Sequence, residues 1–367
     1  MTKDSKKLVV LTAGGTGGHV YPAEALACEL ENRGYQVILF TDKRGLHNYK
    51  GKLGEIENKA ICSGSVVGKS AVTKLTSLFK VGIGFLQAIY WLLRKRPVCV
   101  VGFGGYASFP TGLGAAFLHI PLVLHEQNSV MSRTNRILAR FATMVAQSFP
   151  NAKNTPKNVQ TILSGMPIRK NIADLFAKPF KKRDEKSKMI MVVLGGSQGA
   201  KIFADVVPEA IKITDKAIQK NLKIYQQCRK GEEEKIKALY DGLEVEVIVS
   251  HFFYDMPKLY DEADFIVSRA GASSVYEIAA AGLPSVLIPL PIAADNHQYY
   301  NAKEFEDRGA GIVLKQDDFD ADALKGIVEY FYDNPEKMVE MSKTAKEIAI
   351  VDAAKRLADV VEKVYEK

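Results

Sequence analysis

Cysteine is scarce in this sequence. Among its 367 residues there are four cysteines, Cys28, Cys62, Cys99 and Cys228. They include no Cys-x-x-Cys pair and no spacing typical of metal ligands, and sparse use of cysteine in a long chain suits a reducing compartment. We therefore expect the four side chains to serve packing.

Long hydrophobic runs are also lacking. The longest mostly apolar stretch, residues 81–93, contains two glycines and Gln87 and is shorter than the roughly 20 residues that span a bilayer. The apolar run near the start, residues 8–11, is too short for the hydrophobic region of a secretory signal. We therefore expect no transmembrane helix and no secretory signal sequence. Residues 8–12 are instead predicted to form a buried strand.

Acidic residues are outnumbered by basic ones. The 42 Asp and Glu against 50 Lys and Arg give a formal net charge of +8, which favours contact with anions such as phosphorylated ligands, acidic lipids or nucleic acid. The basic residues are dispersed, however, and no nucleic-acid recognition motif is present. We therefore expect no nucleic-acid partner.

Three motifs common at nucleotide sites are missing. The first glycine-rich loop, residues 14–19, is neither the Gly-x-Gly-x-x-Gly loop of dinucleotide-binding proteins nor a phosphate-binding loop that ends in Lys-Ser/Thr. No Asp-x-Asp motif follows a predicted strand, which disfavours a metal that bridges a diphosphate. Helix N-termini and Arg169 would then neutralise the leaving group.

What the chain has instead is a regular alternation of short Val-, Ile- and Leu-rich runs with longer amphipathic segments. This alternation is typical of βα units whose parallel sheet is buried on both faces, so we predict the α/β class. In the first half, strands are predicted at residues 8–12, 36–41, 98–102, 122–125 and 144–147. In the second half, they are predicted at residues 189–194, 222–227, 246–250, 265–268, 285–288 and 311–314.

The two halves begin alike, each with an apolar strand, a glycine loop and a helix. The chain also has the length of two ordinary domains. We predict two Rossmann-like parallel-sheet domains, residues 1–165 and 166–351, with a linker near residues 164–167 and a last helix over residues 352–366. Ligands collect beyond the carboxyl ends of parallel strands, so two facing sheets would form one cleft.

Glycine loops that follow strands can bind anions, because backbone amides at a helix N-terminus then approach the ligand closely. Three such loops are present, at residues 14–18, 102–106 and 195–199. At residues 125–128, the sequence His-Glu-Gln-Asn places four polar side chains at the end of another predicted strand. A purely structural segment would be apolar there, so we favour a functional role.

His19 ends the first glycine loop, close to the start of a predicted helix. It can serve as general base for a sugar hydroxyl, because histidine titrates near neutral pH. The alternative is a histidine that only hydrogen-bonds the loop.

In the second half, a helix predicted to begin near Ser273 offers its backbone amides to a diphosphate. Glu277, within the first turns, could accept hydrogen bonds from two ribose hydroxyls, or it is merely favoured by the positive helix end. Residues 295–301 follow the next strand, and their Asp, Asn and Gln side chains suit sugar hydroxyls.

Taken together, these motifs extend in order from about residue 9 to residue 302 and closely resemble those of the undecaprenyldiphospho-muramoylpentapeptide β-N-acetylglucosaminyltransferases. The resemblance implies a GT-B fold and inverting transfer of N-acetylglucosamine from UDP-N-acetylglucosamine. The acceptor implied is the C4 hydroxyl of N-acetylmuramic acid in undecaprenyl-diphospho-N-acetylmuramoyl pentapeptide (lipid I), and the product is lipid II. No cofactor and no metal are implied. The resemblance does imply a peripheral place on the cytoplasmic face of the membrane and contact with other cell-wall synthesis proteins.

The resemblance also divides the substrates between the domains. The acceptor would lie in the first domain, to which residues 352–367 return, and the donor mostly in the second. The donor-binding residues implied are Thr16, Gly17, Gly18, Asn128, Arg169, Ser197, Phe253, Ala272, Ser273, Ser274, Val275, Tyr276, Glu277 and Gln298. The acceptor-binding residues implied are Gly14, Gly15, Gly104, Gly105 and Tyr106. The catalytic base would be His19 or Glu126, and we favour His19.

A lipid-linked acceptor requires contact with a membrane surface, and residues 69–96 offer a candidate. Basic residues such as Lys69 and Lys80 alternate there with apolar ones such as Phe79 and Ile83. This mixture suits an anionic membrane surface, with each charge contributing about 1 kcal/mol. The alternative is an ordinary core helix with a solvated basic face.

Two other functions share part of the pattern. A GT-B enzyme that glycosylates diacylglycerol would have the same fold and donor helix, but the His-Glu-Gln-Asn segment and the paired glycine loops count against it. A Rossmann-type oxidoreductase is disfavoured because the first loop lacks Gly-x-Gly-x-x-Gly and the second half repeats the first.

Overall fold

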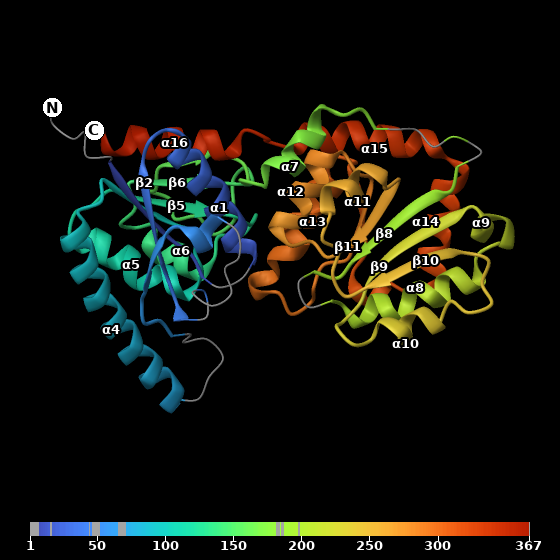
Figure 1. The fold of residues 1–367 in the computed structure, drawn as a ribbon, viewed down its shortest axis with the longest axis horizontal. Helices are drawn as coiled ribbons and strands as arrows, with labels where there is room; N and C mark the ends of the chain where they lie inside the picture. The colour runs from blue at the N-terminus through green and yellow to red at the C-terminus, as the bar shows by residue number, and fades with distance from the viewer. Residues whose placement is uncertain are drawn as a thin grey trace. The chain divides into compact units, whose positions relative to one another are not determined.

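The computed structural model describes residues 7–14, 17–43, 45, 52–64, 71–180, 184, 187–196 and 199–366. The chain forms two compact units (Figure 1), of which the first comprises Met1–Arg169 and Ile350–Lys367 and the second Lys170–Ala349. The linker expected at residues 164–167 belongs to the first unit. Each unit contains one parallel sheet with helices packed on it, so the α/β prediction is confirmed.

The sheet of the first unit has seven described strands in the order β3-β2-β1-β4-β5-β6-β7. They are β1 (Leu8–Thr12), β2 (Gln36–Thr41), β3 (Glu57–Ala60), β4 (Cys99–Gly102), β5 (Leu122–Glu126), β6 (Met144–Gln147) and β7 (Thr161–Leu163). The five strands predicted in this half are confirmed to within one residue. The sequence analysis missed β3 and β7, because edge strands are partly solvated and need no continuous apolar run.

The helices of this unit are α1 (Gly17–Asn32), α3 (Lys52–Glu55), α4 (Ala71–Lys95), α5 (Gly105–Phe117), α6 (Arg133–Leu138) and α16 (Ala353–Tyr365). Successive strand residues point to opposite faces of the sheet. Val9 and Leu11 pack with apolar residues of α1 and α16, whereas Val10 packs with α4 and α5. The last helix of the chain therefore completes the core of the first unit.

Helix α4 is longer than the apolar stretch considered above. Its segment Leu75–Lys95 has 21 residues and, by length and composition alone, is long and apolar enough to cross a membrane, although 22% of an 18-residue window within it is buried. The apolar helix is therefore longer than the stretch of residues 81–93 considered in the sequence analysis, because the two glycines and Gln87 do not interrupt it. Gly84 instead lets α4 approach the loop before it: a Cβ there would lie 1.9 Å from the carbonyl O of Cys62. Gln87 Oε1 accepts a hydrogen bond from the backbone N of Cys62, 2.8 Å away.

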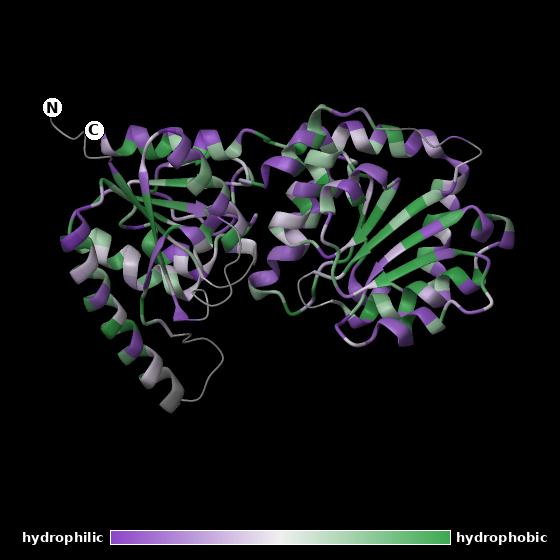
Figure 2. Cartoon of the chain, in the orientation of Figure 1, coloured by the Kyte–Doolittle hydropathy of each residue, from purple (hydrophilic) through white to green (hydrophobic). Residues whose placement is uncertain are grey.

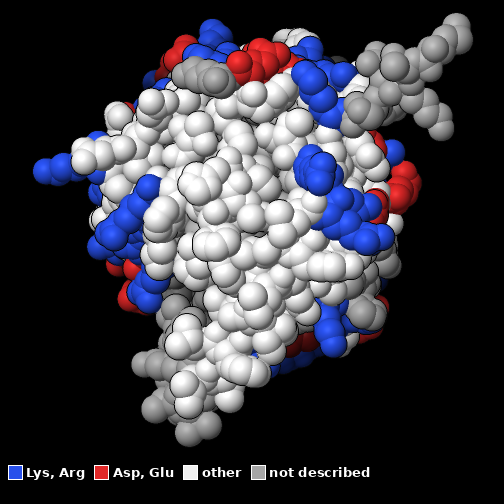
Figure 3. Space-filling model, turned by 90° about the vertical axis from the view of Figure 1, so that its left-hand side faces the viewer, with Lys and Arg blue, Asp and Glu red and all other residues white. Residues whose placement is uncertain are grey.

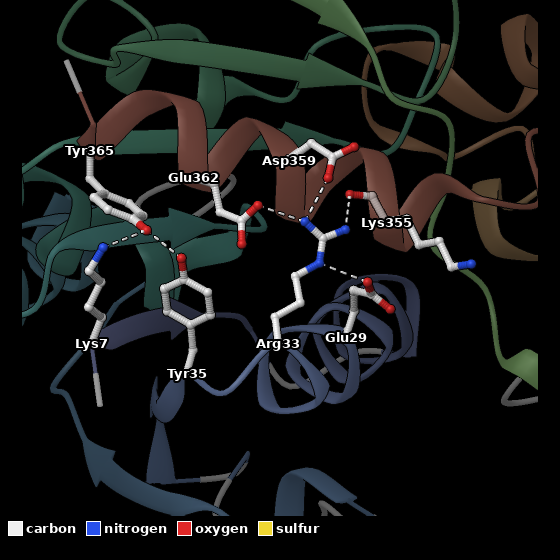
Figure 4. A network of polar contacts seen from close by, with 8 residues as sticks. All are labelled: Lys7, Glu29, Arg33, Tyr35, Lys355, Asp359, Glu362 and Tyr365. Atoms are coloured by element: carbon white, nitrogen blue, oxygen red, sulfur yellow. Dashed lines mark hydrogen bonds and ion pairs between the residues drawn. The ribbon is translucent and has the colours of Figure 1, made fainter. Parts of the chain in front are cut away.

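Polar contacts also fasten α16 to the rest of the first unit (Figure 4). Arg33, just after α1, is 2.9 Å from Glu29 Oε1, 2.6 Å from Asp359 Oδ1 and 2.8 Å from Glu362 Oε2. It also donates to the Lys355 carbonyl at 3.1 Å. At the far end of the helix, the hydroxyls of Tyr35 and Tyr365 are hydrogen-bonded. The guanidinium thus joins three acidic groups from α1 and α16.

Replacing Arg33 by alanine is expected to lower the free energy of unfolding of the first unit by about 1–2 kcal/mol, because a partly buried network is lost. Trp91, the chain's single tryptophan, lies in this unit on α4, so its fluorescence in a urea titration reports the change. Arg356→Ala is the matched control, since Arg356 pairs at 2.8 Å with Asp352 of its own segment and is half-exposed. Equal shifts for both variants would contradict a specific role for Arg33.

The sheet of the second unit has six described strands in the order β10-β9-β8-β11-β12-β13. They are β8 (Met189–Leu194), β9 (Leu222–Gln227), β10 (Glu246–Ser250), β11 (Phe265–Ser268), β12 (Ser285–Leu287) and β13 (Gly311–Val313). All six predicted strands are confirmed, the last two ending one residue early. Apolar residues predominate along the strands of both sheets (Figure 2).

The α-helices of the second unit are α7 (Lys170–Ala173), α8 (Lys201–Ile213), α9 (Lys216–Lys220), α10 (Glu233–Ala238), α11 (Met256–Glu262), α12 (Ala272–Ala281), α13 (His297–Glu306), α14 (Ala321–Asp333) and α15 (Pro335–Ile348). Its short 3₁₀ helices are η1 (Asp174–Ala177), η2 (Ala294–Asn296) and η3 (Gln316–Asp318). Helices α8 and α14 share one core cluster with β8 and β11. Helices α8, α12 and α13 begin after the carboxyl ends of β8, β11 and β12, where a parallel sheet binds its ligands.

Candidate functional site

Two glycine loops of the first unit meet at the carboxyl ends of β1 and β4. A Cβ on Gly105 would lie 3.4 Å from the Cα of Gly14, so the two backbones are almost in contact. Gly104 and Gly105 have φ angles of 81° and 76°, in the left-handed region that favours glycine. Ser108 Oγ lies 2.8 Å from the Thr12 carbonyl O and 2.6 Å from that of Gly104, which fixes one loop to the other.

His19 lies in the first turn of α1 and is half-buried. Its ring lies beside the second loop: a Cβ on Gly104 would be 3.5 Å from Nε2, and one on Gly105 would be 3.7 Å from Cε1. Larger side chains at these two positions would therefore press on the imidazole. The structure brings His19 together with Gly14, Gly104 and Gly105, and the exposed Tyr106 follows them.

The rest of the first loop is described only in part. Gly15 and Thr16 lie outside the described residues, and Gly17 and Gly18 begin α1. Arg169 is half-buried, with its Cζ 5.1 Å from the centre of the Tyr21 ring on α1. This predicted donor residue is therefore held beside the helix that carries His19.

Glu126 ends β5 and is buried. Its carboxylate accepts hydrogen bonds from Asn128 N at 3.1 Å, Asn128 Nδ2 at 3.3 Å, Ser132 N at 2.9 Å and Asn135 Nδ2 at 2.8 Å. Burial raises the pKa of this carboxyl, and the four hydrogen bonds act in the opposite direction. A carboxylate that already accepts four hydrogen bonds is poorly placed to take a proton from a sugar. Its geometry instead suits positioning of Asn128.

Asn135 is a residue that the sequence analysis missed. It is buried, and its Nδ2 donates both to Glu126 Oε2 and, at 3.2 Å, to the His125 carbonyl. Its amide lies 3.6 Å from the position of a Cβ on Gly104, the same point that His19 Nε2 approaches. Asn135 therefore connects Glu126 to the loop beside His19. The available signal was Ser132, whose Oγ accepts a hydrogen bond from Asn135 N at 3.4 Å as the N-cap of α6.

The glycine loop of the second unit joins β8 to α8. A Cβ on Gly195 would lie 2.3 Å from Ala200 N, and one on Gly199 would lie 2.9 Å from the Cys228 carbonyl O, so both positions require glycine. Gly195 N donates to Gln227 Oε1 at 3.1 Å. Ser197 lies outside the described residues.

Helix α12 begins one residue earlier than expected, with Gly271 at its N-cap position. Its first turns contain the predicted donor residues Ala272, Ser273, Ser274, Val275, Tyr276 and Glu277. The helix therefore places a row of backbone N–H groups and a positive helix end beyond β11, as an anion site requires. Glu277 is buried, and its Oε2 accepts a hydrogen bond from the Tyr260 hydroxyl at 3.3 Å.

Two side chains of α13 organise the neighbouring loops. Gln298 Oε1 accepts a hydrogen bond from Leu290 N at 3.0 Å, and Asn301 Nδ2 donates to the Ala270 carbonyl at 3.1 Å. Gln298 thus fixes the segment that follows β12. Phe253, the residue expected near the uracil, is half-buried with its ring 6.0 Å from that of Tyr225.

Arg269 follows β11 and received no separate role in the sequence analysis. Its guanidinium is almost fully buried and donates to neutral groups: the carbonyls of Ile288 at 3.1 Å and Pro289 at 3.3 Å, and Gln316 Oε1 at 2.7 Å. Burial lowers its pKa. This fixed cation adds to the positive potential of the α12 N-terminus. In the part of the chain that the structure describes, no three His, Cys, Asp or Glu side chains gather as metal ligands.

A cavity of about 490 Å³ in the second unit lies elsewhere. It is lined by residues such as Ile190, Asp264 and Leu283, near the amino ends of β8, β11 and β12. In parallel sheets ligands bind at the opposite edge. Lys178 and Asp261 on its wall also form an ion pair of 2.8 Å, so we do not assign the donor to this cavity.

Comparison with known proteins decides the family. Residues 9–147 match the glycosyltransferase family 28 N-terminal domain, and residues 190–357 match the glycosyltransferase family 28 C-terminal domain. The chain belongs to glycosyltransferase family 28. The first match lies within the first structural unit, and the second covers most of the second unit and continues into residues 350–357 of the first.

Similarity to individual members of family 28 extends over nearly the whole chain. The chain is 40% identical to a Rhodospirillum rubrum protein over 96% of this chain and 91% of the relative. It is 41% identical to a Paramagnetospirillum magneticum protein over 97% of this chain and 96% of that relative. Both relatives are named UDP-N-acetylglucosamine–N-acetylmuramyl-(pentapeptide) pyrophosphoryl-undecaprenol N-acetylglucosamine transferase.

Among solved structures, Acinetobacter baumannii MurG superimposes with a TM-score of 0.80 at 32% identity, covering 97% of this chain and 99% of that one. The family resemblance and the GT-B fold expected from the motifs are thereby confirmed, and the chain is a glycosyltransferase. The oxidoreductase alternative is excluded by the same matches.

Proposed function

We propose that the chain transfers N-acetylglucosamine from UDP-N-acetylglucosamine to the C4 hydroxyl of N-acetylmuramic acid in lipid I, which gives lipid II for peptidoglycan synthesis. The observation that carries this proposal is identity of about 40% over nearly the full length of relatives named for that transfer. The glycine loops, the His-Glu-Gln-Asn segment and the α12 N-terminus lie within the matched length. Similarity confined to the α12 segment would support only a UDP-sugar donor.

In the proposed reaction, the C4 oxygen of the acceptor attacks the anomeric carbon of the donor. A bond forms between these two atoms, the bond from the anomeric carbon to the diphosphate oxygen breaks, and UDP leaves with inversion. We assign the proton of the hydroxyl to His19, because its half-buried imidazole ends the first glycine loop and lies beside Gly104 and Gly105 of the second. Glu126 positions Asn128 through the hydrogen bonds described above.

The donor diphosphate is assigned to the amino end of α12 and the glycine loop before α8, with Arg269 and Arg169 supplying positive charge. These groups would neutralise the charge that develops on the leaving diphosphate. Donor-binding roles are also proposed for Gln298 and Glu277. Gly14, Gly104, Gly105 and Tyr106 are assigned to the acceptor.

We place the protein at the cytoplasmic face of the membrane, bound through α4. Figure 3 shows a broad face with few charged groups, bordered by Lys and Arg. The exposed apolar side chains of α4 are Leu75, Leu78, Phe79, Ile83, Leu86, Tyr90 and Leu93. Such a face buries its apolar groups in the lipid interface while basic residues at its edge contact anionic headgroups. Lys69, named above with this segment, lies outside the described residues.

The decisive experiment incubates the full chain with radiolabelled UDP-N-acetylglucosamine and a lipid I analogue, with and without a chelator of divalent cations. We expect label to move to the lipid I analogue at rates that agree within about twofold in both conditions, because helix N-termini and arginines hold the diphosphate. Transfer to diacylglycerol, but not to the lipid I analogue, would favour the second GT-B function. Loss of transfer in chelator would contradict the role given to α12 and the arginines.

A further inference from the structure

His125 and Gln127 belong to the His-Glu-Gln-Asn segment, but the proposed chemistry uses neither. Both side chains are buried. Gln127 Nε2 lies 3.1 Å from His125 Nδ1, so Nδ1 accepts that hydrogen bond, and Nε2 donates to the Gly165 carbonyl O at 3.1 Å. Burial lowers the pKa of His125 to about 4, which keeps the ring neutral near pH 7.

Gly165, the acceptor of that bond, lies where the chain leaves and re-enters the first unit. The chain passes to the second unit after Arg169 and returns at Ile350. A Cβ on Gly165 would lie 2.5 Å from the Cβ of Ile350 and 3.2 Å from that of Ala353, and its φ of 78° also favours glycine. Both connections between the units therefore converge on one residue.

The outgoing and returning segments are each fixed to the first unit near this point. Gly165 N donates to the Gln147 carbonyl at 3.2 Å, and Ser148 Oγ lies 3.4 Å from the Gly165 carbonyl O. On the returning side, Ile350 leads into α16, whose apolar face fills the core. The hydrogen bond from His125 Nε2 joins the point where these two segments meet directly to β5, the strand that ends at Glu126.

We propose that His125, held in one tautomer by Gln127, is a positioning residue that fixes the crossing of the two connecting segments relative to the active-site strand. This inference rests on the proposed function, in which donor and acceptor are bound mainly by different units. The two connecting segments then link the donor-binding residues to the acceptor-binding residues, so their position affects how closely the anomeric carbon approaches the acceptor hydroxyl. A displacement of the reacting atoms by about 1 Å lowers a rate by roughly 10²-fold.

The test compares His125→Phe, which keeps a ring of similar size but has no N–H, with His125→Gln, whose amide N–H reaches about the position of Nε2. For His125→Phe we expect the kcat of transfer to fall by about 10- to 10²-fold. UDP affinity should remain within about twofold, because the residues assigned to UDP lie mainly in the second unit. His125→Gln should recover most of the rate. Equal losses in both variants, or lost UDP affinity, would overturn the proposal.

A distance measurement separates this role from a merely structural one. The exposed Lys363 of the first unit and Lys212 of the second are each replaced by cysteine and spin-labelled, so that the distance between the labels reports the separation of the units. Cys28 and Cys62, which are not fully buried, are replaced by serine so that they take up no label. We expect a broader distance distribution for His125→Phe and the original one for His125→Gln. An unchanged distribution for His125→Phe would overturn the proposal even if transfer falls. If the unmodified protein transfers nothing to the lipid I analogue, the proposed function fails, while the distances still test the crossing.

Discussion

Replacing His19 by alanine is expected to lower turnover by roughly 10² to 10⁴, the usual contribution of a general base. The affinity for UDP-N-acetylglucosamine should stay close to that of the unmodified protein, because the His19 ring lies beside Gly104 and Gly105, which are assigned to the acceptor. Single-turnover kinetics with a lipid I analogue, together with titration of UDP binding, separates the two effects.

Two further variants sharpen this result. His119→Ala removes an exposed histidine that follows α5 and precedes the amino end of β5, whereas Glu126 and the glycine loops follow the carboxyl ends of strands. This variant should leave turnover unchanged. Glu126→Gln would turn an amide N–H₂ toward the donors Ser132 N and Asn135 Nδ2, so we expect a lower thermal midpoint along with a lower rate. If His19→Ala retains full turnover while Glu126→Gln loses it at unchanged stability, Glu126 is the base.

The strands were predictable because buried parallel strands require continuous apolar runs, and all eleven predicted strands are present. Strands β3 and β7 were not predictable, since edge strands such as Thr161–Leu163 are exposed and carry no continuous apolar run. The apolar length of α4 was underestimated because its glycines were read as interruptions. Gly84 instead serves close approach to Cys62, a contact between positions 22 residues apart that no local pattern reveals.

The candidate site was predictable where function requires an unusual local sequence, as in the glycine loops with φ angles near 80°. Asn135 and Arg269 were not predictable in the same way. Each acts through contacts with residues distant in sequence, Asn135 with Glu126 and Arg269 with Ile288. A polar residue on a short helix is usually solvated, so only the fold shows that Asn135 is buried beside the loop of His19.

Replacing Phe79 by glutamate is expected to weaken binding to anionic vesicles by at least about tenfold. Phe79 is 72% exposed on α4, among other exposed apolar side chains. Burying such a side chain in lipid contributes about 2 kcal/mol, a carboxylate near an anionic surface costs about 1 kcal/mol, and 1.4 kcal/mol corresponds to about tenfold in affinity. Flotation with phosphatidylglycerol vesicles measures the change.

Ile213→Glu is the matched control, because Ile213 is 44% exposed but lies at the end of α8 in the second unit. Its vesicle binding should equal that of the unmodified protein. Both variants should transfer sugar normally to a water-soluble acceptor, since neither residue lies near the glycine loops in sequence or in the contacts described above. If Phe79→Glu binds vesicles as well as Ile213→Glu does, the membrane contact is not made by α4. If its transfer to the soluble acceptor falls as well, the loss of vesicle binding reflects a damaged first unit and not a lost lipid contact.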